Sequence, residues 1–175
     1  MRDNMTVEIR RMSASALAAT DAESSPEARA ECLERALHRI SDIDEEIFPG
    51  NVWGLKAYSD STVHDYDHLI AAFAKTDAKD EALIGFALLR CFDDAELIRI
   101  AVDKSFRRQG VGRKLLDELI TETKNRNIKD IFLEVRIGND PAVSMYRAAG
   151  FTDAGVRKNY YSEPKEDALI MRYTC

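Results

Sequence analysis

The sequence predicts an α/β fold in which helices cover both faces of a mixed sheet. Residues 82–89 form an almost continuous apolar run, which is typical of a central strand buried on both faces. Residues 97–102 form a second strand, which leads through a basic turn with two glycines into an amphipathic helix over 111–127. A third strand, 132–136, is followed by a helix that begins near Pro141 and stops at Gly150. Strands and helices that alternate in this way indicate an α/β domain.

The N-terminal third adds a strand over 7–12 and a long helix from about Ala28 to the Phe48-Pro49-Gly50 segment. Ser24, Ser25 and Pro26 supply the expected start of that helix. The region 13–47 has no clear role, and its docking on the sheet is left open.

The remaining segments complete the pattern. Residues 51–65 are loop-like or mixed, 66–73 fit either a helix or a strand, 77–80 form a charged turn, and 167–171 form the last strand. We expect one domain over 1–175, with a central core at about 84–151 and a C-terminal hairpin at about 152–175.

Composition narrows the class of protein. The 175 residues suffice for one domain with its own core, and 45% hydrophobic and 32% charged residues are ordinary for a soluble protein. No apolar run approaches the roughly 20 residues that span a bilayer. The alternating start at 6–10 does not resemble a signal peptide, so we expect a cytoplasmic protein with no membrane partner. The net charge of −6 argues against nucleic-acid binding.

Cysteine and histidine give no sign of a metal site or a disulfide framework. The three cysteines are few, odd in number and far apart, and Cys91 reads as a small core residue at the end of a strand. His64 and His68 are four residues apart, but no glutamate follows the first as in a zinc-protease helix. We expect both to be solvent-facing polar residues.

The turn between the second strand and its helix predicts an anion site. Gly110 and Gly112 leave room for a phosphate and permit turn dihedrals that other residues resist. The first N–H groups of the helix point at such a ligand, with the positive end of the helix dipole behind them. Arg107, Arg108 and Arg113 would add cationic donors at the rim. The spacing fits neither a dinucleotide fingerprint nor a nucleoside triphosphate loop.

The spacing Arg107-x-x-Gly110-x-Gly112 resembles the R/Q-x-x-G-x-G/A pattern of the GCN5-related N-acetyltransferases (GNAT family). The downstream motifs L-E-V-R, N-x-x-A-x-x-x-Y, G-F, R-x-N-Y-Y and D-A-x-I-M resemble the RimI-type branch, the ribosomal-protein alanine N-acetyltransferases. Together these motifs span roughly residues 84–171.

The resemblance implies acetyl-coenzyme A as co-substrate and a GNAT-like domain whose mostly antiparallel sheet contains a splayed pair of strands at its middle. A kink or bulge in the strand before the turn would expose backbone to the pantetheine arm. The residues implied in cofactor binding are Ile100, Ala101, Val102, Arg107, Arg108, Gln109, Gly110, Val111, Gly112, Arg113, Asn139 and Tyr146.

Two residues are candidates for acid–base chemistry. A lone glutamate in an apolar strand is costly to bury unless it is paired or functional, so Glu134 is either a partner of Arg136 or Arg99 or, as the resemblance implies, the general base. An α-amine with a pKa of about 8 needs only a modest base. Tyr146 is either an aromatic core residue or, by resemblance, the general acid for the thiolate. Asn139 is equally well explained as a turn residue.

The acceptor site is predicted between two aromatic segments. By resemblance Tyr160 and Tyr161 contact the substrate, although adjacent strand residues point to opposite faces, so that at most one should face the pocket; a solvent-edge pair is the alternative. Phe48 and Trp53 would form the opposite wall. The Phe48–Trp53 segment departs from the F-x-x-P-W-S form associated with the branch, which places acceptor specificity in doubt.

Three functions therefore compete. The first is N-acetylation of a protein N-terminal amine by direct attack, in a monomer or homodimer that binds no metal. The second keeps acetyl-coenzyme A but acetylates a small amine such as a polyamine or an antibiotic. The third is a coenzyme A-binding module without catalysis, against which Glu134 and Tyr146 both count.

Overall fold

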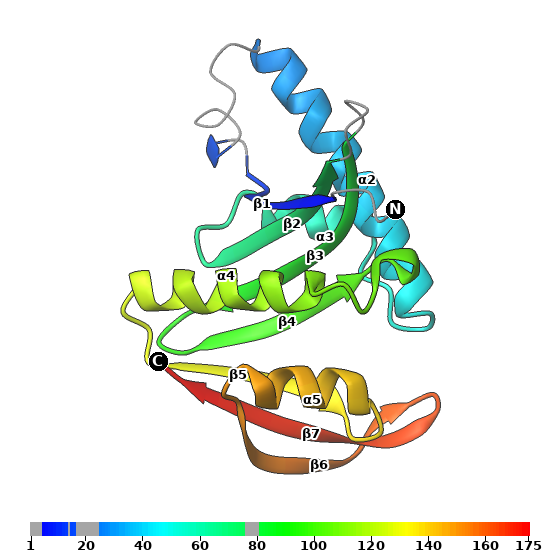
Figure 1. Cartoon of the computed structure of the whole chain (residues 1–175), viewed down its shortest axis with the longest axis vertical. Helices are drawn as coiled ribbons and strands as arrows, with labels where there is room; N and C mark the ends of the chain where they lie inside the picture. The colour runs from blue at the N-terminus through cyan, green and yellow to red at the C-terminus, as the bar shows by residue number, and fades with distance from the viewer. Residues whose placement is uncertain (1–4, 14, 17–24, 76–80) are drawn as a thin grey trace.

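The computed structural model describes residues 5–13, 15–16, 25–75 and 81–175. Its centre is a seven-stranded sheet in the order β1-β2-β3-β4-β5-β7-β6 (Figure 1). Neighbouring strands are antiparallel except β4 and β5, which are parallel. The strands are β1 (Thr6–Arg11), β2 (Asp67–Lys75), β3 (Glu81–Cys91), β4 (Ala95–Val102), β5 (Asp130–Arg136), β6 (Thr152–Ser162) and β7 (Lys165–Thr174).

Helices cover both faces of the sheet. The helices are α2 (Pro26–Ile47), α3 (Gly54–Ser61), α4 (Val111–Asn125), α5 (Asp140–Ala148) and a single 3-10 turn, η1 (Lys104–Phe106). Apolar residues of α4 and α5 form one buried cluster with the sheet, and those of α2 and α3 form a second cluster on the opposite face (Figure 1). This arrangement confirms the predicted fold class, a mixed and mostly antiparallel sheet between two layers of helices.

Helix α2 begins where the sequence predicted. The Ser25 side chain accepts a hydrogen bond from the Ala28 amide, and Pro26 occupies the first turn. The helix ends at Ile47, before the Phe48-Pro49-Gly50 segment. Its buried stripe contains four apolar residues, as the helical spacing predicted, and also the carboxylate of Asp44.

Two ambiguous segments have definite structures. Residues 54–61, within the stretch expected to be loop-like or mixed, form α3, whose Tyr58 and Ser61 are buried. Residues 67–75 form the strand β2, and all but Lys75 are buried. A strand buried on both faces lacks the alternation that identifies strands from sequence, which is why the pattern was ambiguous. The predicted turn at 77–80 lies outside the described residues, as does most of 13–25.

The expectation for His68 was wrong. The side chain is 4% exposed on β2, and its Nδ1 lies 3.6 Å from Glu122 Oε1 on α4. Burial lowers the pKa of His68 to about 4 despite the opposing Glu122 carboxylate. His64 remains exposed and stacks on Tyr66, with ring centroids 4.8 Å apart. Cys91 is buried, as expected. Within the described ranges, no helix is long and apolar enough to cross a membrane.

Candidate functional site

The two middle strands of the sheet separate after three paired residues. Residues 95–97 of β4 pair with residues 131–133 of β5, and the remaining length of each strand has no pairing to the other in the described sheet. The cause is a bulge, because Leu97 pairs with Leu89 of β3 whereas Arg99 pairs with the adjacent Leu88, which leaves Ile98 as an extra residue. As a result β4 and β5 diverge toward their C-terminal ends, as Figure 1 shows, and we call this divergence the wedge.

The basic turn connects the open end of β4 to α4. Arg108 and Gly110 both adopt the left-handed conformation, with φ of 61° and 80°. The first helical hydrogen bond runs from the Lys114 amide to the Gly110 carbonyl, so the amides of Val111 and Gly112 have no acceptor within the helix. A side chain at Gly110 would meet nothing within 4 Å, which leaves open space beside these amides. This geometry fits an anionic group such as a pyrophosphate.

Gly112 also has a role in packing. A Cβ atom built there would lie 3.1 Å from the Met145 Sδ atom on α5. The missing side chain therefore allows α4 to approach α5, whereas the open space for a ligand lies at Gly110.

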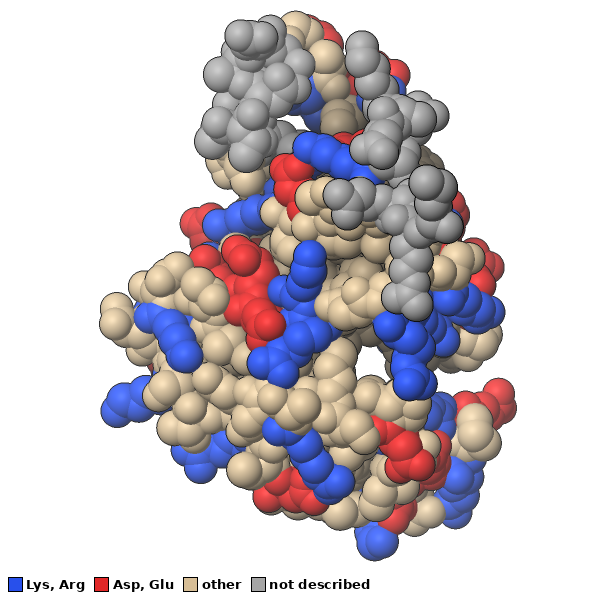
Figure 2. Space-filling model, in the orientation of Figure 1, with Lys and Arg blue, Asp and Glu red and all other residues tan. Residues whose placement is uncertain are grey.

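Two of the three arginines at the turn form hydrogen bonds within the protein, and the third forms none with the described residues. Arg107 Nε donates to the Val102 carbonyl at 3.1 Å, and Arg113 binds both Asp117 and the Ala148 carbonyl, each at 2.8 Å. Arg108 has no hydrogen bond or ion pair with any residue in the described ranges, and it is exposed. Figure 2 shows basic side chains beside a hollow on the side of the molecule where β4 and β5 separate. Gln109 donates to the Ser105 carbonyl and stabilises the turn.

Glu134 lies on β5 at the open part of the wedge. Its neighbours Leu133 and Val135 belong to the apolar cluster beneath α4 and α5, so by alternation Glu134 points to the opposite face. Its Oε1 atom lies 2.9 Å from Arg157 Nη1 on β6. The ion pairs expected with Arg136 or Arg99 are therefore not formed, because Arg136 binds Glu166 and Arg99 binds Asp44.

Tyr146 lies on the other face of the sheet. It is 5% exposed on α5, where its ring packs on Phe151 at a centroid distance of 5.7 Å. Burial, and to a smaller extent Tyr161, raise the pKa of its phenol well above the ordinary value. The hydroxyl therefore keeps its proton throughout the neutral range.

Tyr160 and Tyr161 do not alternate across the strand as expected. Their ring centroids are 5.0 Å apart in an edge-to-face contact, because a bulge between Arg157 and Tyr161 interrupts the β6–β7 register and Asn159 adopts a φ of 54°. Hydrogen bonding to the Glu134 carboxylate favours the protonated hydroxyl of Tyr160 and raises its pKa to about 12.

Tyr161 is half-buried, and several charged side chains act on its phenol. Burial raises the pKa of its phenol, the adjacent Arg136 guanidinium opposes that shift, and the charges of Glu134 and Arg99 act on it as well. Arg136 lies over its ring at 4.1 Å. The C-terminal hairpin thus brings the tyrosine pair beside Glu134 and Arg136 of β5, and the charge of Tyr161 also acts on Tyr146.

Asn139 caps the helix that carries Tyr146. Its side-chain oxygen accepts a hydrogen bond from the Ala142 amide at 3.3 Å, and Pro141 lies in the first turn. Its observed contact is therefore the capping role of a turn residue.

Phe48 and Trp53 lie at the two ends of the segment that connects α2 and α3. The Arg99 guanidinium of β4 lies 4.4 Å from the centre of the Phe48 ring and 5.9 Å from that of Trp53. Trp53 is further fixed by its amide, which donates to Asp44 Oδ2 at 2.8 Å. The segment is thus attached to β4, whose backbone forms one side of the wedge.

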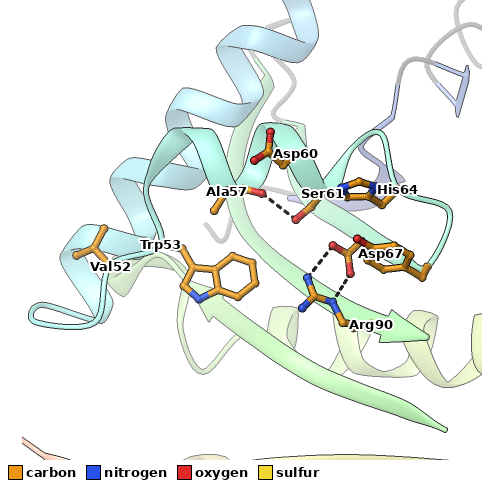
Figure 3. A pocket seen from close by; sticks show the side chains of 9 residues that line it. Val52, Trp53, Ala57, Asp60, Ser61, His64, Asp67 and Arg90 are labelled. Carbon is orange, nitrogen blue, oxygen red and sulfur yellow. Dashed lines mark hydrogen bonds and ion pairs between the residues drawn. The ribbon is translucent and has the colours of Figure 1, made fainter. Parts of the chain in front are cut away.

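A shallow cavity of about 370 Å³ lies on the other side of Trp53, between α3 and the ends of β2 and β3 (Figure 3). It does not include Glu134, Tyr146 or the tyrosine pair. Three of its polar side chains are engaged within the protein: Arg90 forms two hydrogen bonds of 2.8 and 2.9 Å with Asp67, and Ser61 donates to the Ala57 carbonyl.

Three contributors to the site escaped the sequence analysis. Arg157 forms the ion pair with Glu134, and Asp44 and Arg99 hold the connecting segment. A carboxylate on the apolar stripe of a predicted helix and an arginine within an apolar strand were the available signals. Neither signal identifies its partner, because the two residues are 55 positions apart and meet only in the folded chain.

The combination of a splayed sheet and a glycine turn before a helix defines the class to which the fold belongs. The chain is a member of the acetyltransferase (GNAT) family, whose family model matches residues 37–151. The predicted family is therefore confirmed.

Sequence relatives support a particular branch. The chain is 42% identical over 95 residues to the [ribosomal protein bS18]-alanine N-acetyltransferase of Salmonella typhimurium. This alignment covers 53% of this chain and 64% of that protein. It is 46% identical over 81 residues to the protein of the same name from Escherichia coli K12, covering 45% and 55% of the two chains. The aligned part thus spans about three-fifths of the length of these curated relatives.

Solved structures extend the similarity to the whole fold. The crystal structure of the Escherichia coli ribosomal-protein-S18-alanine N-acetyltransferase superposes with a TM-score of 0.70 at 27% identity, covering 97% of this chain and 94% of that one. Arabidopsis thaliana NAA60 in complex with acetyl-CoA has a TM-score of 0.76 at 16% identity, covering 97% of this chain and all of that chain, and shares the fold.

Proposed function

We propose that this chain transfers the acetyl group of acetyl-coenzyme A to the α-amine at the N-terminus of a protein. The observation that supports this proposal most directly is the wedge between β4 and β5, with Glu134 on one face of the sheet and Tyr146 on the other. The family and the names of the relatives point in the same direction.

The chain has the features that the co-substrate requires. The free amides at the start of α4, the open space at Gly110 and the unpaired cation of Arg108 suit its phosphates. The unpaired edge of β4 around Ile100 and Val102 suits an amide-containing arm that binds in the manner of an added strand, and Ala101, between them, faces the α2 cluster. When bound, the co-substrate supplies an activated thioester for the acceptor to attack.

Glu134 is proposed as the general base. It lies on the face of the sheet that also carries α2, α3 and the segment with Phe48 and Trp53. An acceptor bound between that segment and the tyrosine pair would present its amine to this carboxylate. The carboxylate removes a proton from the amine nitrogen, directly or through water, as the nitrogen forms its bond to the acetyl carbon.

Tyr146 is proposed as the general acid. The carbon–sulfur bond breaks as the new bond forms, and its electron pair remains on the departing sulfur. The phenol, buried on the α5 side, gives its proton to that sulfur. A charged thiolate is costly in such an apolar environment, which favours proton transfer even from a phenol whose pKa is raised.

The acceptor class is tested with a panel of amines and acetyl-coenzyme A. The panel contains peptides that begin with alanine, the same peptides with a blocked N-terminus and an internal lysine, polyamines and aminoglycosides. We expect mass spectrometry to locate a single acetyl group on the free α-amine. Acetylation of the blocked peptides or of the small amines alone would contradict the proposed acceptor, and binding without any transfer would contradict the proposed enzyme.

A small amine is the second candidate acceptor. The observation in its favour is the sequence of the connecting segment, which contains Gly50 and Asn51 and departs from the F-x-x-P-W-S form of the peptide-acetylating branch. The Arg99 side chain packs beneath this segment. For either acceptor we propose a cytoplasmic location, since all three cysteines are free, as is usual in a reducing compartment.

A further inference from the structure

A buried ion pair lies beneath the segment that connects α2 and α3. Asp44 of α2 is fully buried and Arg99 of β4 is 6% exposed, with 3.4 Å between Asp44 Oδ1 and Arg99 Nε. The pair occupies positions that the patterns of both elements would assign to apolar side chains. A buried pair of this kind contributes little net stability, because desolvation offsets the attraction between the charges. Its presence therefore calls for another explanation.

The bulge in β4 is what places Arg99 here. Leu97 belongs to the cluster beneath α4, and in a strand that alternated regularly Arg99, two residues later, would point to that same face. With the bulge, Ile98 and Arg99 both lie on the α2 side. The bulge that opens the wedge thus also directs the Arg99 guanidinium toward the α2 side of the sheet, where the acceptor is proposed to bind.

Both partners of the pair hold the connecting segment. Arg99 Nη2 donates a hydrogen bond to the Asn51 carbonyl, and its guanidinium lies over the Phe48 ring at 4.4 Å. Asp44 Oδ2 accepts a hydrogen bond from the Trp53 amide at 2.8 Å. One ion pair therefore fixes the beginning, middle and end of the segment against the strand that borders the wedge.

The pair retains free hydrogen-bonding capacity. Asp44 Oδ1, Arg99 Nε and the nearby hydroxyl of Tyr58 are buried and have no hydrogen-bond partner within the described part of the chain. Asp44 and Arg99 act on Tyr58 in opposite directions, and together with burial the carboxylate raises the pKa of that phenol. Unpartnered buried groups reduce the free energy of unfolding. The arrangement is thus better suited to fixing a geometry than to stabilising the fold.

We propose that Asp44 and Arg99 are positioning residues of the acceptor site, which set the distance between the Phe48–Trp53 segment and the wedge. The inference rests on the proposed function, because it assigns this segment to the acceptor. The charge of Arg99 also acts on the phenol of Tyr161, which belongs to the opposite aromatic wall. The residues act through the segment and take no part in the proton transfers.

The test compares three variants: Asp44→Asn, Arg99→Met and the double variant. Each single change leaves one buried charge unpaired and lowers the melting temperature, whereas the double change removes both charges and recovers most of it. We expect the KM for the acceptor peptide to rise about tenfold in all three, while kcat and the KM for acetyl-coenzyme A stay within about twofold. Arg10→Gln, which removes an ion pair with Glu81 at the far edge of the sheet, is the matched control.

The double variant distinguishes positioning from simple stabilisation. If the pair served only stability, acceptor KM would return to the wild-type value together with the melting temperature, and the inference would be wrong. An equal rise in the KM for acetyl-coenzyme A would also contradict it.

Trp53 gives a readout that does not depend on activity, because it is the single tryptophan of the chain. In the double variant we expect its fluorescence to be quenched more readily by acrylamide. If the wild-type protein acetylated no amine, the proposed function would fail, and this readout would still report whether the pair holds the segment. Unchanged quenching in the double variant would contradict the inference whatever the activity.

Discussion

Arg157 Nη1 lies 2.9 Å from Glu134 Oε1, so a cation of the protein occupies the position next to the candidate base. The arginine side chain is 58% exposed and comes from β6, whereas the glutamate is 18% exposed on β5. An acceptor that arrives as an ammonium ion would meet this guanidinium at the carboxylate. The contact therefore has consequences for how an amine enters the site.

We predict that Arg157→Gln lowers the KM for a cationic acceptor about two- to fivefold at low salt, because repulsion of like charges is removed. Steady-state kinetics at two ionic strengths measure the effect, which should diminish at high salt. Arg147→Gln, which breaks an exposed ion pair with Asp153, is the control. A higher acceptor KM in the Arg157 variant would instead show that the arginine assists binding.

Glu134→Gln should lower kcat by about 10²- to 10⁴-fold, the usual contribution of a general base. The amide has nearly the same shape and can still bond to Tyr160, so the KM for acetyl-coenzyme A should be unchanged. The exposed Glu118 on α4, changed to Gln, controls for loss of a negative charge. Full activity in the Glu134 variant would remove this residue from the mechanism.

Tyr146→Phe should lower kcat by about 10²-fold while the melting temperature changes little. The phenylalanine ring keeps the contact with Phe151, and only the hydroxyl is lost. Single-turnover measurement of thiol release isolates the step in which this hydroxyl is proposed to act. A large loss of stability with normal kcat would mean that Tyr146 is only a core residue.

Gly110→Ala should lower the free energy of unfolding by about 1–2 kcal/mol, since a φ of 80° is unfavourable for a residue with a side chain. The KM for acetyl-coenzyme A should also rise, because the added methyl group enters the open space beside the free amides. Gly110→Asn tolerates the left-handed conformation better and should recover stability but not affinity. Calorimetry and initial rates separate the two effects.

His68 should make the fold sensitive to acid. Its pKa is about 4 in the folded chain against an ordinary value of 6.5, so between these values the unfolded chain binds more protons. The stability that depends on neutral His68 is complete above pH 6.5 and falls by about 3 kcal/mol as the pH drops to 4. Denaturant titrations of wild type and His68→Gln across this window measure it. An equal slope against pH in both proteins would exclude His68 as the cause.

Most of the fold followed from local patterns. The strand, glycine turn and helix at 97–127 and the capped start of α2 are determined by neighbouring residues, and both were predicted. Residues 67–75 were ambiguous because burial on both faces removes alternation. Residues 54–61 form a two-turn helix, too short for its periodicity to emerge from the flanking loops.

The candidate site was only partly predictable. The residues at the turn and around Glu134 and Tyr146 belong to recognisable motifs, but their contacts do not. The pairing of Glu134 with Arg157 depends on the course of β6, whose bulge also places two adjacent tyrosines on one side. Asp44 and Arg99 meet because the bulge in β4 breaks the alternation of the strand and turns Arg99 to the α2 side. Irregularities of this kind are set by tertiary packing and leave little trace in a single sequence.

The extra residue in β4 determines whether the middle of the sheet is open or closed. Deleting Ile98 would restore an even register with β3, and each later residue of the strand would keep its present face, because Arg99 would follow Leu97 directly and still point to the α2 side. The ladder to β5 would then be free to extend past Leu97. Such a chain would tend toward a continuous sheet with no entrance at its middle, so one inserted residue separates a structural sheet from one that can admit a reactant.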